Sequence, residues 1–203
     1  MAAACAARGG GEAAWAREAA FTGGVLGSGV DDNFKNYHAW AHRGWALALL
    51  APASAGFHAA RSDELAFTQA LLAADARNNS AWNHRHRLLT AAAAAPAERA
   101  AELVLMRAAV AASPRNESVW AHAAGLLAAW REDAAFPAAV LQLCADEAER
   151  TGCPHASALL AEAAQAAGQG ERARAVFLGL AASDPIRGHY YALRAAGCGP
   201  QTA

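Results

Sequence analysis

The most constraining feature of this 203-residue sequence is a motif that occurs three times. A basic residue and an asparagine come first, and a tryptophan and a histidine follow four and six positions after the asparagine. The copies occupy residues 35–43, 77–85 and 115–122. Their tryptophans, Trp40, Trp82 and Trp120, are 42 and 38 residues apart. Repeats of this length in helix-favouring sequence indicate a solenoid of helical hairpins, because each hairpin can bury its apolar face only against a neighbour.

Composition supports an all-helical chain. Alanine, the strongest helix former, is the most frequent residue, and no runs of alternating β-branched residues occur. The sequence therefore predicts an all-α fold, a right-handed solenoid of antiparallel helical hairpins of the tetratricopeptide-like kind. The formal net charge of −1 leaves no large basic surface, which argues against a nucleic-acid partner.

The pattern divides the chain into three parts. We expect an alanine- and glycine-rich N-terminal segment at 1–30, partly disordered, a helical-repeat domain at 31–197 and a tail at 198–203. Further helices are expected between and after the motifs, at 62–75, 97–112, 133–150, 154–168 and 170–182. A last helix is expected to open at Asp184, with Asp184 as its cap and Pro185 in its first turn.

Cysteine and hydropathy patterns exclude several other classes. Cys5, Cys144, Cys153 and Cys198 are scattered and form no closely spaced pairs. We therefore expect free thiols and no metal site in this chain. No strongly apolar run is long enough to cross a bilayer, so we expect no transmembrane segment and a cytoplasmic location.

The three motifs are specific enough to suggest a family. Residues 36–45, 77–85 and 116–120, in this order, resemble the later repeats of the protein prenyltransferase α subunit. The match is best to the α subunit shared by farnesyltransferase and geranylgeranyltransferase type I. Residues 184–187, followed by the aromatic pair Tyr190-Tyr191, resemble the C-terminal helix of that family.

The resemblance implies a crescent of hairpins around a β subunit. That partner would carry the catalytic zinc, with magnesium as a further possible cofactor, and this chain would carry none. The heterodimer would transfer a farnesyl or geranylgeranyl group from its isoprenoid diphosphate to the cysteine of CaaX-protein substrates. Family α subunits have further repeats upstream, one of which supplies a lysine, a tyrosine and a glutamine to the active site. This chain begins after that repeat, so it is interpreted as either a C-terminal fragment or a reduced paralogue.

The resemblance also implies site residues in the first motif. Lys35 and Tyr37 would act at the diphosphate rim, and Asn36 and His38 would contact substrate. Lys35 is the only lysine in the chain, whereas arginine takes its place in the other two motifs. The structural alternatives are a surface cation for Lys35, a helix cap for Asn36 and an interface aromatic for Tyr37.

The remaining motif residues are interpreted as structural. The three tryptophans would form the core of the repeats, and Asn78 and Asn116 would cap their helices. The motif histidines, including the pair His38 and His42 four residues apart, are expected to pack and to hydrogen-bond rather than to bind a metal.

Two other functions stay open. One is the α subunit of Rab geranylgeranyltransferase, which differs in substrate. The other is a non-catalytic helical-repeat adaptor that has kept the fold and lost the β partner. The absence of the upstream lysine repeat favours the adaptor, and the sequence details of the second motif and of residues 184–187 favour the CaaX type.

Overall fold

The computed structural model describes residues 10–27, 33–50 and 54–198. These residues form ten α-helices and one short 3-10 helix, with no strand among them. The expected all-α fold of helical hairpins is therefore confirmed. The chain divides into two compact units at Pro96, and each is described by itself.

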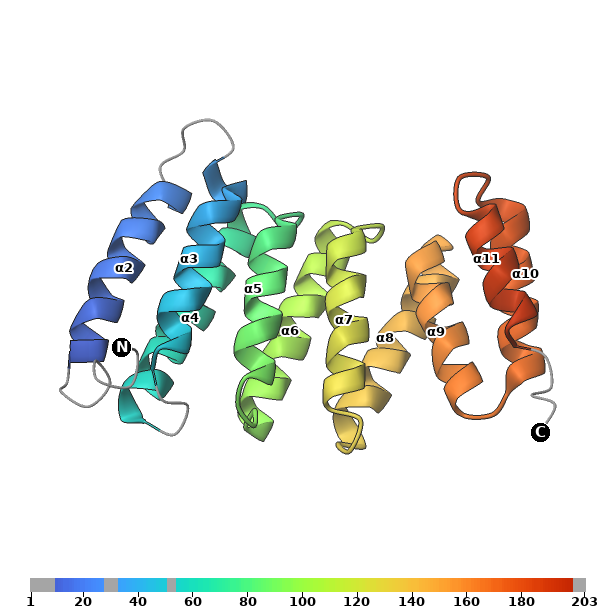
Figure 1. The fold of residues 1–203 in the computed structure, drawn as a ribbon. Helices are drawn as coiled ribbons and strands as arrows, with labels where there is room; N and C mark the ends of the chain where they lie inside the picture. Colours follow the sequence, from blue (N-terminus) through green and yellow to red (C-terminus); the bar gives the residue numbers. More distant parts are fainter. Residues whose placement is uncertain (1–9, 28–32, 51–53, 199–203) are drawn as a thin grey trace. The chain divides into compact units, whose positions relative to one another are not determined.

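The first unit contains the first two Trp–His motifs. Figure 1 shows α2 beside α3, and α4 next to α3 and α5. The elements are α2 (Gly10–Gly27), the 3-10 helix η1 (Asn33–Lys35), α3 (Tyr37–Ala48), α4 (Ala55–Ala74) and α5 (Asn79–Thr90). The two motifs form the starts of α3 and α5, so each tryptophan lies in the first turn or two of its helix.

The second unit contains the third motif and four further helices (Figure 1). Its elements are α6 (Pro96–Ala112), α7 (Glu117–Ala129), α8 (Ala135–Thr151), α9 (Pro154–Ala166), α10 (Gly170–Ser183) and α11 (Gly188–Ala196). Gly152 and Gly168 end α8 and α9 with positive φ angles of 62° and 77°, a conformation that costs glycine nothing.

The N-terminal segment differs from the sequence expectation. Residues 10–27 form a continuous helix that packs along α3, although a partly disordered segment was expected up to residue 30. Trp15 of α2 is buried in one cluster with Leu47, Leu50 and Phe57. This helix, α2, is the first helix of the first hairpin and packs against the repeat domain expected from residue 31. Residues 1–9 and 28–30 lie outside the described part, as do Cys5 and most of the expected tail, 199–203.

The last hairpin is held by a small core between α9, α10 and α11. Phe177 and Tyr191 stack with ring centroids 6.4 Å apart and an interplanar angle of 22°. Buried alanines, among them Ala161 and Ala173, let the helices approach closely around these rings. The expected opening at Asp184 is shifted, since residues 185–187 form a turn and α11 begins at Gly188.

Candidate functional site

The asparagine of each motif caps the following helix. The Oδ1 atom of Asn36 accepts hydrogen bonds from the backbone N–H groups of His38 and Ala39, at 3.0 and 3.2 Å. Asn78 and Asn116 accept one each, from Ala81 at 3.0 Å and from Ser118 at 3.1 Å. These bonds satisfy N–H groups that have no partner within the helix. They also fix the residue at which each helix begins, and with it the position of the residues on either side of the asparagine.

The tryptophan of each motif ties its helix to the preceding turn. The indole N–H groups of Trp40, Trp82 and Trp120 donate to backbone carbonyls six residues upstream. The acceptors are Phe34, Ala76 and Pro114, at 2.7, 2.8 and 2.8 Å. All three rings are buried, with 7%, 1% and 3% of their surface exposed. A buried indole that keeps its hydrogen bond can pack without a desolvation penalty, so this part of the motif is structural.

The histidine of each motif binds a glutamate on the helix before it. His84 and Glu64 are joined by a contact of 2.8 Å, and His122 and Glu102 by one of 2.7 Å, both deeply buried. His42 and Glu18 repeat the arrangement at 2.7 Å in a more exposed setting. Buried carboxylates are stable only when paired, so each pair fixes the register of the two helices of a hairpin.

An arginine follows the histidine in the first two motifs and bonds the same preceding helix. Arg43 donates to the carbonyl of Ala19 at 2.8 Å and to the hydroxyl of Thr22 at 2.9 Å. Arg85 makes the equivalent contacts to Leu65 and Thr68, at 2.7 and 3.1 Å. The third motif has alanine in place of this arginine, at Ala123, and methionine in place of the threonine, at Met106. The arginine and the threonine are thus present together or absent together.

Glu64 is the point where two hairpins of the first unit meet. Its carboxylate accepts from Nε of Arg43 at 2.6 Å, forms a second, very short contact with the same guanidinium, and also binds His84. Burial alone would raise the pKa of Glu64, but the hydrogen bonds from His84 and Arg43 outweigh it. They hold the pKa below its usual value of 4.5.

This lowered pKa predicts acid lability of the first unit. Because the folded-state pKa of Glu64 lies below its unfolded value, its contribution to stability is complete above pH 4.5 and is lost as the pH falls through the folded pKa. We expect the denaturation midpoint to drop below pH 4.5, and the Glu64→Gln variant to be less stable at neutral pH with a flatter acid dependence. Urea titrations at several pH values measure both, and equal acid slopes in the two proteins would contradict the assignment.

The residues expected at the diphosphate rim lie together at the start of α3. Lys35 ends η1, and its ammonium lies 4.8 Å from the centroid of the Phe34 ring. Tyr37 is 76% exposed, and its ring meets that of the exposed His38 edge-on at 5.6 Å. The structure therefore brings Lys35, Tyr37 and His38 to one exposed edge, whereas the amide oxygen of Asn36 is committed to the cap.

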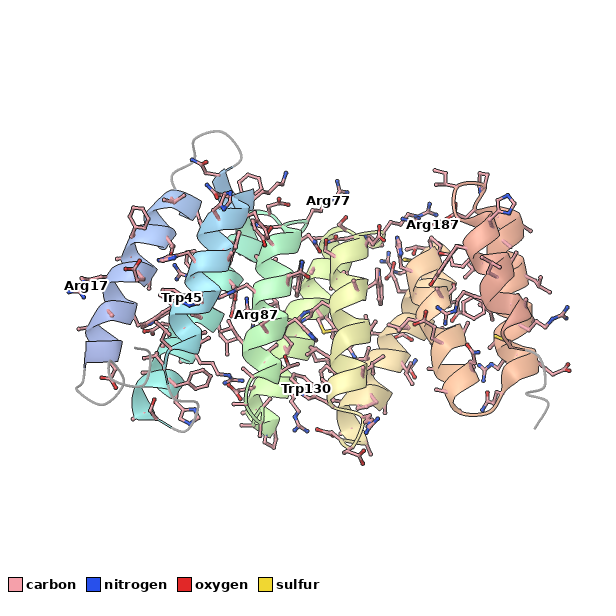
Figure 2. All side chains as sticks on the ribbon, viewed as in Figure 1. Arg17, Trp45, Arg77, Arg87, Trp130 and Arg187 are labelled. Carbon is pink, nitrogen blue, oxygen red and sulfur yellow. The ribbon has the colours of Figure 1, made fainter. Side chains whose placement is uncertain are left out.

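The equivalent edge of the second motif is different. Arg77 lies in the turn leading into α5 (Figure 2), exposed, with its backbone N–H bonded to Asp75 at 2.9 Å. Asn79 takes the place of Tyr37. The first motif is thus the one of these two that combines a basic residue with an exposed hydroxyl group.

Sequence reasoning missed the carboxylates that bind the motif histidines. The motif histidines were expected to hydrogen-bond, but their sequence does not indicate that the partners lie on the preceding helix. A signal for two of these carboxylates was available, since Glu18 and Glu64 are each followed four residues later by a threonine. Glu102 lacks that threonine and gives no such signal.

The described residues contain neither a cluster of metal ligands nor a membrane-spanning helix. Within 10–27, 33–50 and 54–198, no group of three or more histidine, cysteine, aspartate or glutamate side chains could hold a metal ion. Cys144, Cys153 and Cys198 are buried free thiols, and burial raises the pKa of Cys144 to about 12. No helix in this part of the chain is long and apolar enough to span a membrane.

The comparisons with known proteins agree with the motifs. Residues 28–50 and 61–92 match the model of the protein prenyltransferase alpha subunit repeat, and they contain the first two Trp–His motifs. These two segments thus match the repeat of that family, and the resemblance seen in the sequence is confirmed for them. No curated protein sequence matches the chain.

Solved structures support the same fold. The chain is similar to one from Candida albicans protein geranylgeranyltransferase-I complexed with GGPP, with a TM-score of 0.71 and 22% sequence identity. The similarity covers 90% of this chain and 59% of the other, so the present sequence spans about three fifths of the length of that relative.

Proposed function

We propose that the chain acts as the α subunit, or as part of the α subunit, of a heterodimeric CaaX protein prenyltransferase. The complex with a β subunit would transfer a farnesyl or geranylgeranyl group from an isoprenoid diphosphate to a C-terminal cysteine of target proteins in the cytoplasm. The family repeats support this proposal. The observation that carries it is the exposed edge formed by Lys35, Tyr37 and His38, in a motif whose Trp40 and Arg43 are buried.

The chemistry assigned to this chain is stabilisation of the leaving group. As the bond from the isoprenoid carbon to the diphosphate breaks, negative charge grows on the bridging oxygen. The ammonium of Lys35 and the hydroxyl of Tyr37 are donors suited to that charge, and His38 lies beside them. The cap made by Asn36 holds these donors at the helix start, which is a positioning role.

Activation of the cysteine thiol falls to the partner subunit. A zinc ion there would lower the pKa of the thiol and hold the thiolate. The described residues of this chain offer no site for zinc, so none of its side chains is assigned to that step.

Assembly with a partner tests the proposal directly. The chain is co-expressed with candidate prenyltransferase β subunits, and complexes are isolated by size-exclusion chromatography. They are then assayed for transfer of a labelled isoprenoid to CaaX peptides. A complex that transfers the isoprenoid is expected, with upstream repeats supplied if the natural gene product contains them. A complex without transfer would indicate the adaptor, and no complex with any β subunit would overturn the proposal.

Substitutions at the exposed edge separate catalysis from assembly. We expect Lys35→Ala and Tyr37→Phe to lower the single-turnover rate of prenyl transfer about tenfold while the heterodimer still forms. Loss of a buried donor to an oxyanion typically lowers the catalytic rate about 100–1000-fold. At an exposed edge the loss is smaller, because water replaces part of the donor's effect. Single-turnover transfer at saturating isoprenoid diphosphate measures the rate.

Arg77→Ala is the matched control, because Arg77 is exposed at the same motif position of the next repeat. It should leave the rate nearly unchanged. Equal small effects at Lys35 and Arg77 would make Lys35 an ordinary surface cation.

A further inference from the structure

The second unit has two adjoining cavities at the end of α7 where the third motif begins. The first, called here the Arg115 cavity, has a volume of about 500 Å³ and lies between the turn before α7, the start of α9 and the turn before α11. The second, of about 430 Å³, extends along α7 and α11. Glu117, His155 and Arg187 line both. Figure 2 shows Arg187 in the turn before α11.

The carboxylates in the Arg115 cavity are already engaged. Arg187 donates to Glu117 at 3.0 Å and lies 3.5 Å from Asp184. Asp184 also accepts from the backbone N–H groups of Ile186 and Arg187, at 3.0 and 3.1 Å. These hydrogen bonds lower the pKa of Asp184, so it stays ionised and its charge is directed at Arg187.

Two donors in the same cavity are not engaged. Among the described residues, the side chains of Arg115 and His155 make no hydrogen bond or ion pair. Arg115 is exposed, and His155 is partly buried at the second position of α9. Burial and the charges of Arg187 and Arg115 lower the pKa of His155, against the opposing effect of the Glu117 and Asp184 carboxylates. The ring is therefore neutral at pH 7, with one nitrogen able to donate.

We propose that the Arg115 cavity binds a small phosphorylated ligand, whose phosphate group is held by Arg115 and His155. The planar guanidinium offers paired N–H groups that match two phosphate oxygens, and the imidazole offers a further donor. The wall formed by Pro154, Leu180 and Ile186 can contact an organic substituent. This site is separate from the edge assigned to prenyl transfer, and it does not depend on that assignment.

The surrounding charges make binding dependent on protonation. Glu117 and Asp184 repel an anion, and protonation of His155 offsets that repulsion. Arg115 and Arg187 attract the anion. The other titratable side chains nearby, Glu162, Tyr190 and Tyr191, line the second cavity. Anion affinity should therefore rise as the pH falls through the titration of His155, and a bound anion should raise the pKa of His155.

Histidine-resolved NMR titration of the intact chain tests the site. The probes are inorganic phosphate, phenyl phosphate and sulfate at constant ionic strength, because added salt alone screens surface charges. Sulfate keeps the same charge throughout the titration of histidine. We expect all three to shift the His155 signals in a saturable way, and sulfate to bind more tightly at lower pH. Tighter binding of phenyl phosphate would identify a phosphate ester as the ligand, and equal binding would identify the free ion.

Four variants give the specificity of the test. Arg115→Gln should weaken binding about tenfold, since a charge-assisted pair is lost. Glu117→Gln should tighten binding severalfold, because a repelling charge is removed. Arg77→Gln, which removes the exposed arginine of the preceding motif, should change nothing. Similar small shifts in the wild type and in the three glutamine variants, or an affinity that does not depend on Arg115, would overturn the proposal. Arg115→Lys keeps the charge and should retain part of the affinity if the fold is unchanged.

Discussion

Trp82→Ala is expected to destabilise the first unit by about 3–5 kcal/mol, because truncation of a buried tryptophan removes its transfer energy and leaves a cavity. Only 1% of the Trp82 surface is exposed, and its indole N–H is bonded to the carbonyl of Ala76 at 2.8 Å. Small domains have about 5–15 kcal/mol of total stability, so this loss could unfold the hairpin of α4 and α5. Urea denaturation followed by circular dichroism measures it.

Two controls distinguish the effect of losing a buried tryptophan from the effect of losing an exposed one. Trp45 lies on the exposed side of α3 (Figure 2) with 58% of its surface in solvent, and Trp45→Ala should cost about 1 kcal/mol or less. Trp82→Phe keeps a ring in the core but loses the hydrogen bond, so its effect should be intermediate. Equal losses for Trp82→Ala and Trp45→Ala would contradict the role given to Trp82 in joining the turn to the helix.

Glu64→Ala is expected to cost about 3–5 kcal/mol at neutral pH, because it leaves the buried guanidinium of Arg43 without its counter-charge. The same substitution also removes the buried hydrogen-bond partner of His84. Both losses act on helices α3 and α5, so the two hairpins of the first unit should separate at lower denaturant. The midpoint and slope of urea unfolding measure the effect.

The neighbouring exposed carboxylate provides the control. Asp63→Ala should change stability by about 0.5 kcal/mol or less, as for other exposed sites. A triple variant with apolar residues of similar volume at Arg43, Glu64 and His84 should lose less than Glu64→Ala alone, since no unpaired charge remains. If Glu64→Ala and Asp63→Ala are equally stable, the Glu64 contacts do not stabilise the fold.

The structure agrees best with the expectations from sequence where local interactions decide it. The helix of each motif begins directly after the asparagine cap, as predicted, and the expected segment 97–112 is close to α6 at Pro96–Ala112. Helix entry depends on side-chain bonds that reach only two or three residues along the chain, and these are visible as residue types. No motif marks α2, a segment rich in alanine and glycine, so residue types alone did not define its bounds.

The amino-acid sequence by itself determined the all-α class, the three-fold repetition, the helix starts and the family of the repeats. Tertiary structure decided which side chains of the motif are buried and what they bind. His84 and His122 find their carboxylates 20 residues upstream, and His42 finds Glu18 24 residues upstream. These partners meet only when two helices pack in one register, and an isolated glutamate in a helix looks the same whether it will be buried or exposed. The same packing covers Trp40 and leaves Tyr37 at the surface three positions earlier.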